Sequence, residues 1–410
     1  MNVRSNPTDY GLEAERELVT ILAFWMKHSP DTERGGFIGR LTSDGRIDPD
    51  APRGSVLNAR ILWTFSAAYR HTGNEQYRII ADQAYTYFTR HFLDQTYGGV
   101  YWSVDSVGQP LSTRKQIYSL AFAIYGLSEY YRVSQEPAAL TTCQDLYHWI
   151  ERYSFDRGDG QSFQGGYFEA FSREGELLSD LRLSEKDRND PKTMNTHLHI
   201  LEGYANLYRI WPDAGLEQQI RGLLETFRTH ILDAETHQMR LFFTAGWQPT
   251  ADLVSFGHDI EASWLLLEAA EVLNDPALIE QFRQIAIDMA RATAEGLQPD
   301  GSLYHELDRA TGHYDRHREW WVSAEAMVGF LNAWQLTGDT HFYEQSVRSW
   351  QFVQQYLLDR ERGEWRWGVL DDYSPMAHED KMGFWKCPYH NARACLEVVE
   401  RSKAGVHKTA

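Results

Sequence analysis

The feature that most constrains the fold is a motif that returns six times along the 410-residue chain. Its clearest copies are Asp31-Thr-Glu-Arg-Gly-Gly-Phe-Ile and Asp94-Gln-Thr-Tyr-Gly-Gly-Val-Tyr, each a turn that leads into a short strand. The six copies lie 63, 67, 72, 64 and 62 residues apart when they are aligned at Gly36, Gly99, Gly166, Gln238, Ser302 and Glu364. The fourth copy lacks the glycines and is the weakest. A near-constant period of this length indicates a repeat architecture.

Segments with helical spacing of apolar residues lie between these hairpins. The spacing predicts a helix that starts within 255–267, and further helices at 13–27, 57–69, 77–92, 115–131, 140–153, 196–208, 216–231, 277–294, 321–335, 342–357 and 384–399. The repeating unit is therefore helix, hairpin, helix, and six units give twelve helices. Strands and long helices do not alternate as in a parallel α/β sheet, so that class is disfavoured.

Two-helix units can stack as an open solenoid or close into a ring. The even-numbered helices are rich in aromatic and apolar residues, as an inner ring requires. We therefore expect an all-α fold, an (α/α)6 barrel of six helix-hairpin-helix repeats with the short β-hairpins at one mouth. The barrel would form a single domain over residues 1–410, with frayed ends at about 1–10 and 403–410.

The amino-acid composition limits the classes of partner that this protein is expected to bind. Lys and Arg number 40 and Asp and Glu 58, and the net charge of −18 argues against nucleic acid or an anionic membrane as the main partner. Three cysteines do not make a disulfide framework. No apolar run has the length of a membrane span, and the N-terminal residues do not resemble a signal peptide. We expect a cytoplasmic protein.

Polar residues that a core helix would not select occur near the starts of the even-numbered helices, which are expected at the same mouth. They are Arg53, Asn58, Arg60, Lys115, Tyr118, Asn195, His197, His199, His258, Glu261, Trp320, Trp321, Trp385, Lys386 and His390. Binding sites form where several elements bring polar and aromatic groups together. Helix capping could explain a single such residue, for example His258. It does not readily explain polar residues at equivalent positions in all six repeats, so we expect a binding site there.

Three histidines in one funnel, His199, His258 and His390, permit two chemistries. With Glu261 they could hold zinc or iron, or they could transfer protons without a metal. A cation is disfavoured by Arg60, which suits a developing oxyanion instead, so we favour proton transfer.

Two further interpretations fit the sequence less well. Cys387, His390 and Cys395 could be zinc ligands, but their spacing on one helix does not give a tight face. Glu261 and Asp187 could be the two carboxylates of a glycoside hydrolase, which would leave the histidines without a role.

Four motifs carry a resemblance to a known family. They are Asn58-Ala-Arg-Ile-Leu-Trp-Thr-Phe, Met194-Asn-Thr-His-Leu-His, Ser255-Phe-Gly-His-Asp-Ile-Glu-Ala and Gly383-Phe-Trp-Lys-Cys-Pro-Tyr-His-Asn. From about residue 13 to residue 400 the chain resembles the N-acylglucosamine 2-epimerase superfamily, in particular its members that act on cellobiose. The resemblance implies an (α/α)6 barrel without a metal or organic cofactor. It also implies reversible 2-epimerisation of the reducing-end glucose of β-1,4-linked disaccharides, which converts cellobiose to glucosyl-mannose and lactose to epilactose.

The resemblance also implies roles for individual residues. His258 and His390 match the two acid/base histidines, and His199 matches the histidine near the substrate carbonyl. Other site residues are matched by Arg60, Glu261, Asn195, Tyr118, Asp187, Trp321 and Trp385, of which the two tryptophans would hold the sugars. One histidine would remove the C2 proton to give an enediolate stabilised by Arg60 and His199, and the other would return a proton to the opposite face. Glu261 would orient His258 or raise its basicity.

Two rival functions remain open. A mannose or fructose isomerase of the same superfamily would return the proton to C1, and an inverting glycoside hydrolase would release glucose. A non-enzymatic sugar-binding protein would not need three histidines. The expected partner is a small disaccharide, bound by a monomer.

Overall fold

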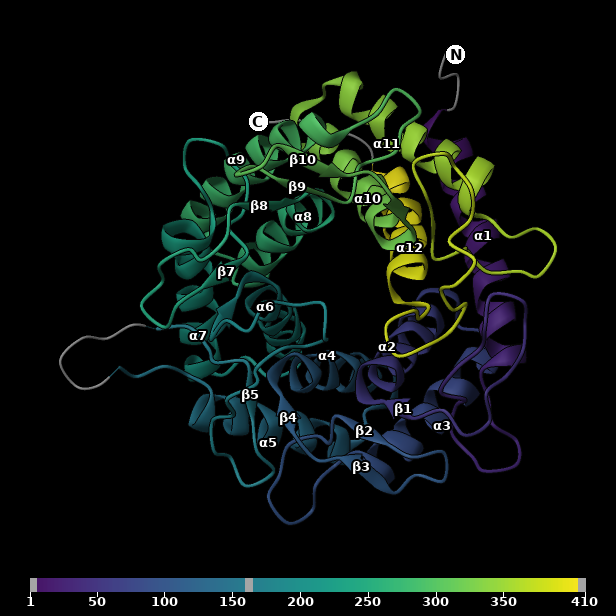
Figure 1. Ribbon diagram of the computed structural model, residues 1–410, viewed down its shortest axis with the longest axis vertical. Helices are drawn as coiled ribbons and strands as arrows, with labels where there is room; N and C mark the ends of the chain where they lie inside the picture. The colour runs from purple at the N-terminus through teal and green to yellow at the C-terminus, as the bar shows by residue number, and fades with distance from the viewer. Residues whose placement is uncertain (1–5, 159–164, 405–410) are drawn as a thin grey trace.

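The computed structural model describes residues 6–158 and 165–404, and within these ranges the chain forms twelve α-helices in two concentric rings (Figure 1). The inner ring consists of the even-numbered helices α2 (Ser55–Thr72), α4 (Ile117–Ser134), α6 (Met194–Tyr208), α8 (Phe256–Val272), α10 (Trp320–Thr337) and α12 (Tyr389–Ala404). The outer ring consists of α1 (Pro7–His28), α3 (Glu75–His91), α5 (Pro137–Tyr153), α7 (Ala214–Thr226), α9 (Pro276–Thr293) and α11 (Thr340–Phe352). The predicted (α/α)6 barrel is confirmed.

The two rings differ in where their apolar residues lie. The outer helix α9 buries one face, which includes Phe282, Ala286 and Met289, and exposes the other, as an amphipathic surface helix does. The inner helix α10 is buried from Val322 to Leu336 because neighbours surround it. This is why the even-numbered helices are aromatic and apolar in sequence.

Glycines allow adjacent inner helices to approach closely. A Cβ atom on Gly126 of α4 would lie 2.6 Å from the carbonyl oxygen of Ala59 in α2, and one on Gly203 of α6 would lie 2.7 Å from that of Ala121 in α4. No real side chain tolerates such a contact, so these positions set the spacing of the inner ring.

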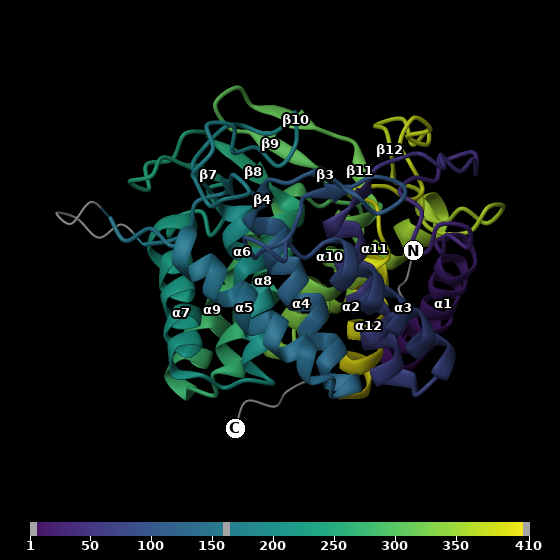
Figure 2. The same ribbon diagram turned by 90° about the horizontal axis from the view of Figure 1, so that it is seen from below.

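The short strands lie together at one end of the barrel (Figure 2). They are β1 (Arg53–Gly54), β2 (Ser103–Val104), β3 (Pro110–Ser112), β4 (Lys115–Gln116), β5 (Ala170–Phe171), β6 (Lys192–Thr193), β7 (Phe242–Phe243), β8 (Leu253–Ser255), β9 (Glu306–Asp308), β10 (His313–Asp315), β11 (Arg318–Glu319) and β12 (Gly368–Val369). The strand that precedes each inner helix pairs antiparallel with the hairpin of the next repeat, as in β1–β2, β4–β5, β6–β7, β8–β9 and β11–β12. A sixth contact, the bridge between Leu41 and Met382, joins the first repeat to the last and closes the ring.

The alignment of the six repeats is confirmed at the level of single residues. Each hairpin has an antiparallel bridge one residue beyond its aligned position, and the bridges are Pro30–Phe37, Leu93–Val100, Phe155–Tyr167, Leu232–Met239, Leu297–Leu303 and Leu358–Trp365. The fourth hairpin forms the same turn although it lacks glycine. His237 takes the left-handed backbone conformation there, with φ 56°, which costs a residue with a Cβ more than it costs glycine.

Buried ion pairs tie the hairpin of a repeat to the strand that follows it. The Lys115 Nζ atom lies 2.9 Å from Asp94, and the Lys192 Nζ atom lies 2.7 Å from Asp156. The pairs Arg53–Asp31 and Lys381–Asp359 repeat the arrangement elsewhere in the ring. Lys115 and Arg53, which were expected at helix starts, therefore belong to short strands and have a structural partner.

Several predicted boundaries were wrong. Helix α12 begins at Tyr389 instead of residue 384, because the residue before Pro388 is disfavoured in helical conformation. Helices α7 and α11 do not continue to residues 231 and 357; each is followed by a π-helical turn, Phe227–Ile231 and Val353–Leu357, and a 3-10 turn, Ala294–Gly296, follows α9.

The ends of the chain are more ordered than expected where the structure describes them. Residues 7–10 form the first turn of α1, and Tyr10 is fully buried, with its hydroxyl 3.1 Å from the Ser346 Oγ atom. Residues 403 and 404 complete α12. The rest of the expected frayed ends lies outside the described residues. Among the helices that the structure describes, none has the length and apolarity that crossing a bilayer requires.

Candidate active site

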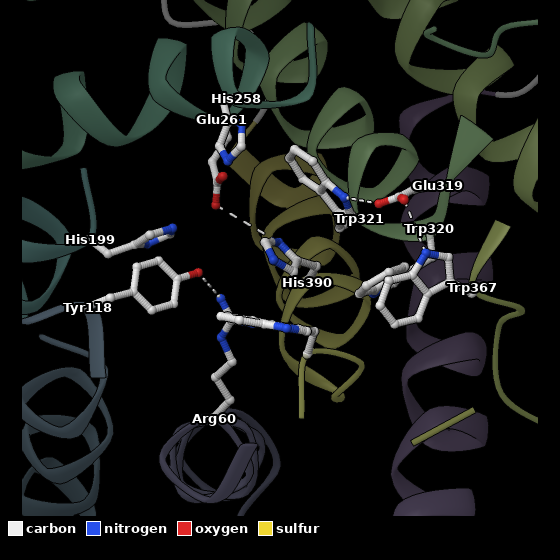
Figure 3. A pocket seen from close by; sticks show the side chains of 11 residues that line it. Arg60, Tyr118, His199, His258, Glu261, Glu319, Trp320, Trp321, Trp367 and His390 are labelled. Carbon is white, nitrogen blue, oxygen red and sulfur yellow. Dashed lines mark hydrogen bonds and ion pairs between the residues drawn. The ribbon is translucent and has the colours of Figure 1, made fainter. Parts of the chain in front are cut away.

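A pocket opens at the hairpin end of the inner ring and contains about 570 Å³ of empty space, part of it open to solvent (Figure 3). Its lining residues come from all six inner helices and from the segments that precede and join them: Arg60, Tyr118, His199, His258, Glu261, Glu319, Trp320, Trp321, Trp367, Trp385 and His390. Aromatic walls with convergent polar groups suit a sugar.

Each of the three pocket histidines has its Nδ1 atom held from behind. In His199 this atom lies 2.9 Å from the Glu202 carboxylate, and in His390 it lies 2.7 Å from the Glu325 carboxylate. In His258 it lies 2.7 Å from the hydroxyl oxygen of Ser255. A carboxylate partner accepts the Nδ1 proton, so Nε2 is the basic nitrogen of a neutral His199 or His390.

A layer of buried charge lies beneath the histidines. Arg393 donates from one terminal nitrogen to Glu261 at 2.6 Å and to Glu325 at 2.7 Å, and from the other to Glu202. Tyr389 donates its hydroxyl proton to the same oxygen of Glu202. One guanidinium thus fixes the two carboxylates that orient His199 and His390, and buried charges held in this way keep a defined geometry.

Burial changes the pKa values of this site. It lowers the pKa of His258 to about 3, helped by the nearby His199 and His305. It also lowers the pKa of His390 well below the usual value, helped by the charges of Arg60 and Arg393. Both rings are therefore neutral near pH 7 and can accept a proton.

The pKa of Glu261 moves in the opposite direction. Burial and the neighbouring Glu325 raise it to about 7, although Arg393 opposes the shift. The Oε2 atom of Glu261 is buried without a hydrogen-bond partner among the described residues. Its other oxygen lies 3.9 Å from the Nδ1 atom of His390.

A fixed positive charge lies on the side of the pocket formed by α2 and α4. The Arg60 guanidinium donates to the hydroxyl of Tyr118 at 2.8 Å (Figure 3). It also stacks over the rings of Phe122 and Tyr389, at 4.1 and 4.8 Å from their centroids. No carboxylate within the described parts of the chain pairs with Arg60, so its charge is available to an anion.

Tryptophans form the opposite wall. The ring of Trp321 packs against His258 at 4.7 Å and against His390 at 5.7 Å between centroids. Its Nε1 atom donates to Glu319 at 2.5 Å, and Trp367 donates to the other oxygen of that carboxylate at 3.1 Å. Burial alone would raise the pKa of Glu319, but His305 and His317 lower it to about 2.

The structure brings most of the predicted site residues into this pocket, namely Arg60, Tyr118, His199, His258, Glu261, Trp321, Trp385 and His390. Asn195 and Asp187 line an adjacent hollow, which His258 also lines. The Asp187 carboxylate accepts the backbone N–H and the hydroxyl proton of Ser184, both at 2.8 Å. Asp187 and Glu261 thus do not face each other across one pocket as the carboxylate pair of a hydrolase would.

The expectation that Glu261 orients His258 was wrong. Helical spacing places the two residues near each other, but Glu261 points to Arg393 and His390, whereas Ser255 holds His258.

Sequence reasoning also missed residues that complete the site, Glu202, Glu319, Glu325, Trp367 and Arg393. A usable signal was present for Glu202, Glu325 and Arg393. Each is a charged residue within an inner helix that is otherwise buried.

The arrangement also bears on the two metal interpretations. Glu261, Glu325 and His390 offer ligand atoms within 4.8 Å of one another, but the Arg393 guanidinium bonds both carboxylates and occupies the position of a cation. The Cys387 thiol accepts a contact from the Arg60 guanidinium at 3.7 Å, and the positive charge of Arg60 at this sulfur would repel a zinc ion. Proton transfer by the histidines fits these contacts better.

The inner ring, its three supported histidines and its aromatic walls define an enzyme of the sugar isomerase and epimerase class on an (α/α)6 barrel. Residues 36–394 match the family model of N-acylglucosamine 2-epimerase (GlcNAc 2-epimerase). The chain belongs to this family.

Its relatives include two proteins named cellobiose 2-epimerase. That of Bacteroides fragilis is 48% identical over 388 residues, which are 94% of this chain and 98% of that protein. That of Ruminococcus albus is 38% identical over 391 residues, with 95% and 98% covered. The solved structure of cellobiose 2-epimerase from Bacillus thermoamylovorans matches with a TM-score of 0.90 at 42% identity, over 96% of this chain and all of that one.

Proposed function

We propose that this enzyme reversibly epimerises C2 of the reducing-end glucose in β-1,4-linked disaccharides, converting cellobiose to glucosyl-mannose and lactose to epilactose. The similar proteins named cellobiose 2-epimerase support this substrate class.

The observation that carries the proposal is the placement of two neutral histidines around one pocket. His258 comes from α8 and His390 from α12, and α10, which supplies Trp321, lies between these helices in the inner ring (Figure 1). Inversion at C2 requires a proton to leave one face of the carbon and another to arrive at the opposite face. Two bases on different walls meet that requirement, and each alternates between acid and base as the reaction reverses.

The intermediate of this reaction is an anion. After the sugar ring opens, loss of the C2 proton gives an enediolate with charge on its oxygens. Arg60, whose charge is not paired with a carboxylate within residues 6–158 and 165–404, and His199 would stabilise that charge. Such a donor is worth about 3–4 kcal/mol in the transition state.

Glu261 would act on this proton transfer through its neighbours. Its carboxylate lies 3.9 Å from His390 and is bonded to Arg393, so it would tune the charge that forms on His390.

The aromatic residues and the adjacent hollow would bind the disaccharide. Trp321 and Trp385 would pack against the apolar faces of the sugar rings, and the Tyr118 hydroxyl would bond a sugar oxygen. Asn195 and Asp187, in the hollow beside His258, would contact sugar hydroxyls outside the reacting ring. In this arrangement the reacting glucose lies beside the histidines in the pocket, and the second sugar lies in the adjacent hollow.

We further propose that catalysis uses no metal or organic cofactor, that residues 1–410 form one catalytic domain, and that the enzyme is a cytoplasmic monomer without a nucleic-acid or membrane partner. The net charge of −18 supports the last two absences.

The decisive experiment is incubation with cellobiose in D2O in the presence of EDTA, followed by NMR at the reducing-end C2. We expect glucosyl-mannose that carries deuterium at C2. Free glucose would instead indicate a hydrolase. Interconversion of mannose and fructose without reaction of cellobiose would indicate an aldose-ketose isomerase with the same histidines.

A further inference from the structure

A second cluster of histidine and carboxylate side chains lies beside the pocket, where β9, β10 and β11 meet. His305 precedes β9, His317 follows β10, and Glu319 ends β11. The rings of His305 and His317 stack with their centroids 4.3 Å apart. One ligand atom from each of the three residues lies within 4.8 Å of the other two.

The cluster has the supporting contacts of a metal site. Asp315 lies 2.5 Å from the Nδ1 atom of His317 and directs the Nε2 atom of that ring toward Glu319, at 3.1 Å. A carboxylate behind a histidine is the usual partner of a metal-binding imidazole. Glu306 adds further negative charge, 3.8 Å from the Nε2 atom of His305.

A second, independent observation at His305 also points to a ligand. The Nδ1 atom of His305 is buried and has no hydrogen-bond partner among the described residues. A buried polar nitrogen without a partner costs free energy, and an ion in the cluster would give His305 a partner.

We propose that His305, His317 and Glu319 bind a first-row transition ion such as Zn²⁺. Two imidazoles and a carboxylate suit zinc, with a fourth position left open to water. Ligand atoms at about 2.0–2.2 Å from a tetrahedral ion lie roughly 3.3–3.6 Å apart. A bound ion would draw the three ligand atoms, which lie within 4.8 Å of one another, into that range. The nitrogen ligands select such ions over Mg²⁺ and Ca²⁺.

The ion would inhibit the enzyme through Glu319. This carboxylate lines the sugar pocket and accepts the indole protons of Trp321 and Trp367. Zinc takes over one of its oxygens and draws it toward His305, which releases at least one of the two tryptophans from its present position. The site is separate from the histidines that transfer protons and takes no part in the reaction.

The test uses the enzyme after dialysis against EDTA, titrated with Co²⁺, whose visible absorption is strong in tetrahedral sites, and then with Zn²⁺ in competition. We expect one equivalent to bind. Zinc affinity should fall about 10–100-fold in Asp315→Asn, as for the loss of any partner behind a ligand, and further in His305→Gln and His317→Gln. The exposed His313, on the same hairpin, provides the matched control His313→Gln, which should bind zinc as the wild type does. Circular dichroism confirms that each variant is folded.

A second arm measures inhibition of cellobiose epimerisation by Zn²⁺, relative to each variant's own activity without metal. The concentration for half inhibition should shift in parallel with the binding affinity. A Co²⁺ spectrum without tetrahedral bands, or unchanged zinc affinity in both His305→Gln and His317→Gln, overturns the site. Binding without inhibition overturns the link to the pocket. The spectra do not depend on the sugar reaction, so they test the site even where the proposed function fails.

Discussion

The Nδ1 atom of His390 lies 2.7 Å from a carboxylate oxygen of Glu325, whereas the same atom of His258 lies 2.7 Å from the hydroxyl oxygen of Ser255. A carboxylate stabilises the imidazolium that forms when a histidine takes a proton. A hydroxyl has no charge to offer and can either donate to the ring or accept from it. The two proposed acid/base groups therefore have unequal support.

This asymmetry predicts unequal effects of two conservative variants. Glu325→Gln should lower kcat on cellobiose by about 10²-fold or more, within the range of general acid–base contributions. Ser255→Ala removes one neutral hydrogen bond, worth about 0.5–1.5 kcal/mol, and should cost no more than about 10-fold. Steady-state kinetics with both variants folded would check this. Equal losses would show that the two supports are equivalent.

Replacement of either proposed base should separate proton exchange from inversion. His390→Asn should lower epimerisation by about 10²–10⁴-fold without unfolding the protein. In D2O its remaining His258 should still exchange the C2 hydrogen of one epimer, and His258→Asn should do the same for the other. NMR of each pure epimer measures this. Wild-type turnover in His390→Asn would contradict the assignment.

The buried His197 predicts a loss of stability in acid. Its Nε2 atom accepts the backbone N–H of Tyr167 at 2.9 Å, and its Nδ1 atom lies 2.7 Å from the Thr193 carbonyl oxygen. Burial lowers its pKa to about 3, whereas the unfolded value is about 6.5. Below pH 6.5 His197 is therefore protonated in the unfolded chain but stays neutral in the folded chain. His197 thus costs about 1.4 kcal/mol of stability for each unit that the pH falls from 6.5 toward 3.

Urea unfolding at pH 7, 6 and 5 would test this expectation. His197→Gln lacks the titrating ring, so its stability should fall by about 2 kcal/mol less than that of the wild type between pH 7 and pH 5. The exposed His313 serves again as the control, since His313→Gln should keep the wild-type slope. If the free energy of unfolding changed with pH equally in His197→Gln and in the wild type, His197 would not contribute to the loss of stability in acid.

Replacement of the buried Lys386 should strongly lower the free energy of unfolding, although this residue is not part of the proposed catalytic group. Its Nζ atom lies 2.8 Å from Glu364, and both side chains are fully buried. The same carboxylate also accepts protons from Trp25 and Asn391. Lys386→Met leaves the Glu364 charge without a cation and should lower the free energy of unfolding by about 3–5 kcal/mol.

Thermal and urea unfolding of Lys386→Met would measure this loss. The double variant with Glu364→Gln should recover part of it because the unpaired charge is gone. A loss below about 1 kcal/mol in the single variant would mean that water reaches the pair, as at exposed salt bridges.

The fold could be predicted in detail because the sequence repeats six times, and each copy predicts the same helix-hairpin-helix unit. Equivalent positions such as Gly36 and Gly99 make equivalent turns, and the aromatic content of the even-numbered helices reflects burial on all sides. The start of α12 was wrong because the helical spacing of residues 384–399 was given more weight than Pro388. The spacing of apolar residues indicates which residues share a helix face. It does not show where the helix begins, which here is set by Pro388 because the residue before a proline is disfavoured in helical conformation.

Most of the residues that line the candidate pocket could be predicted from the sequence, but the contacts between them could not. His258 and Glu261 are neighbours on one helix, yet Glu261 contacts Arg393, which is 132 residues away along the chain. Such partners are set by how six helices converge on the axis, which no local pattern contains. Asp187 was matched through loosely similar flanking residues, and its loop places it beside the pocket instead of within it.

The bridge between Leu41 and Met382 has a consequence for synthesis of the chain. Helix α12, which carries His390 and Arg393, is the last of the inner ring, and it packs between α2 and α10. A nascent chain can form its early helix pairs as they emerge from the ribosome, but it has neither a closed ring nor a full set of histidines until the sixth repeat arrives. Catalytic competence is thus reached in one late step, and a chain released early would present an open apolar inner surface to chaperones and proteases.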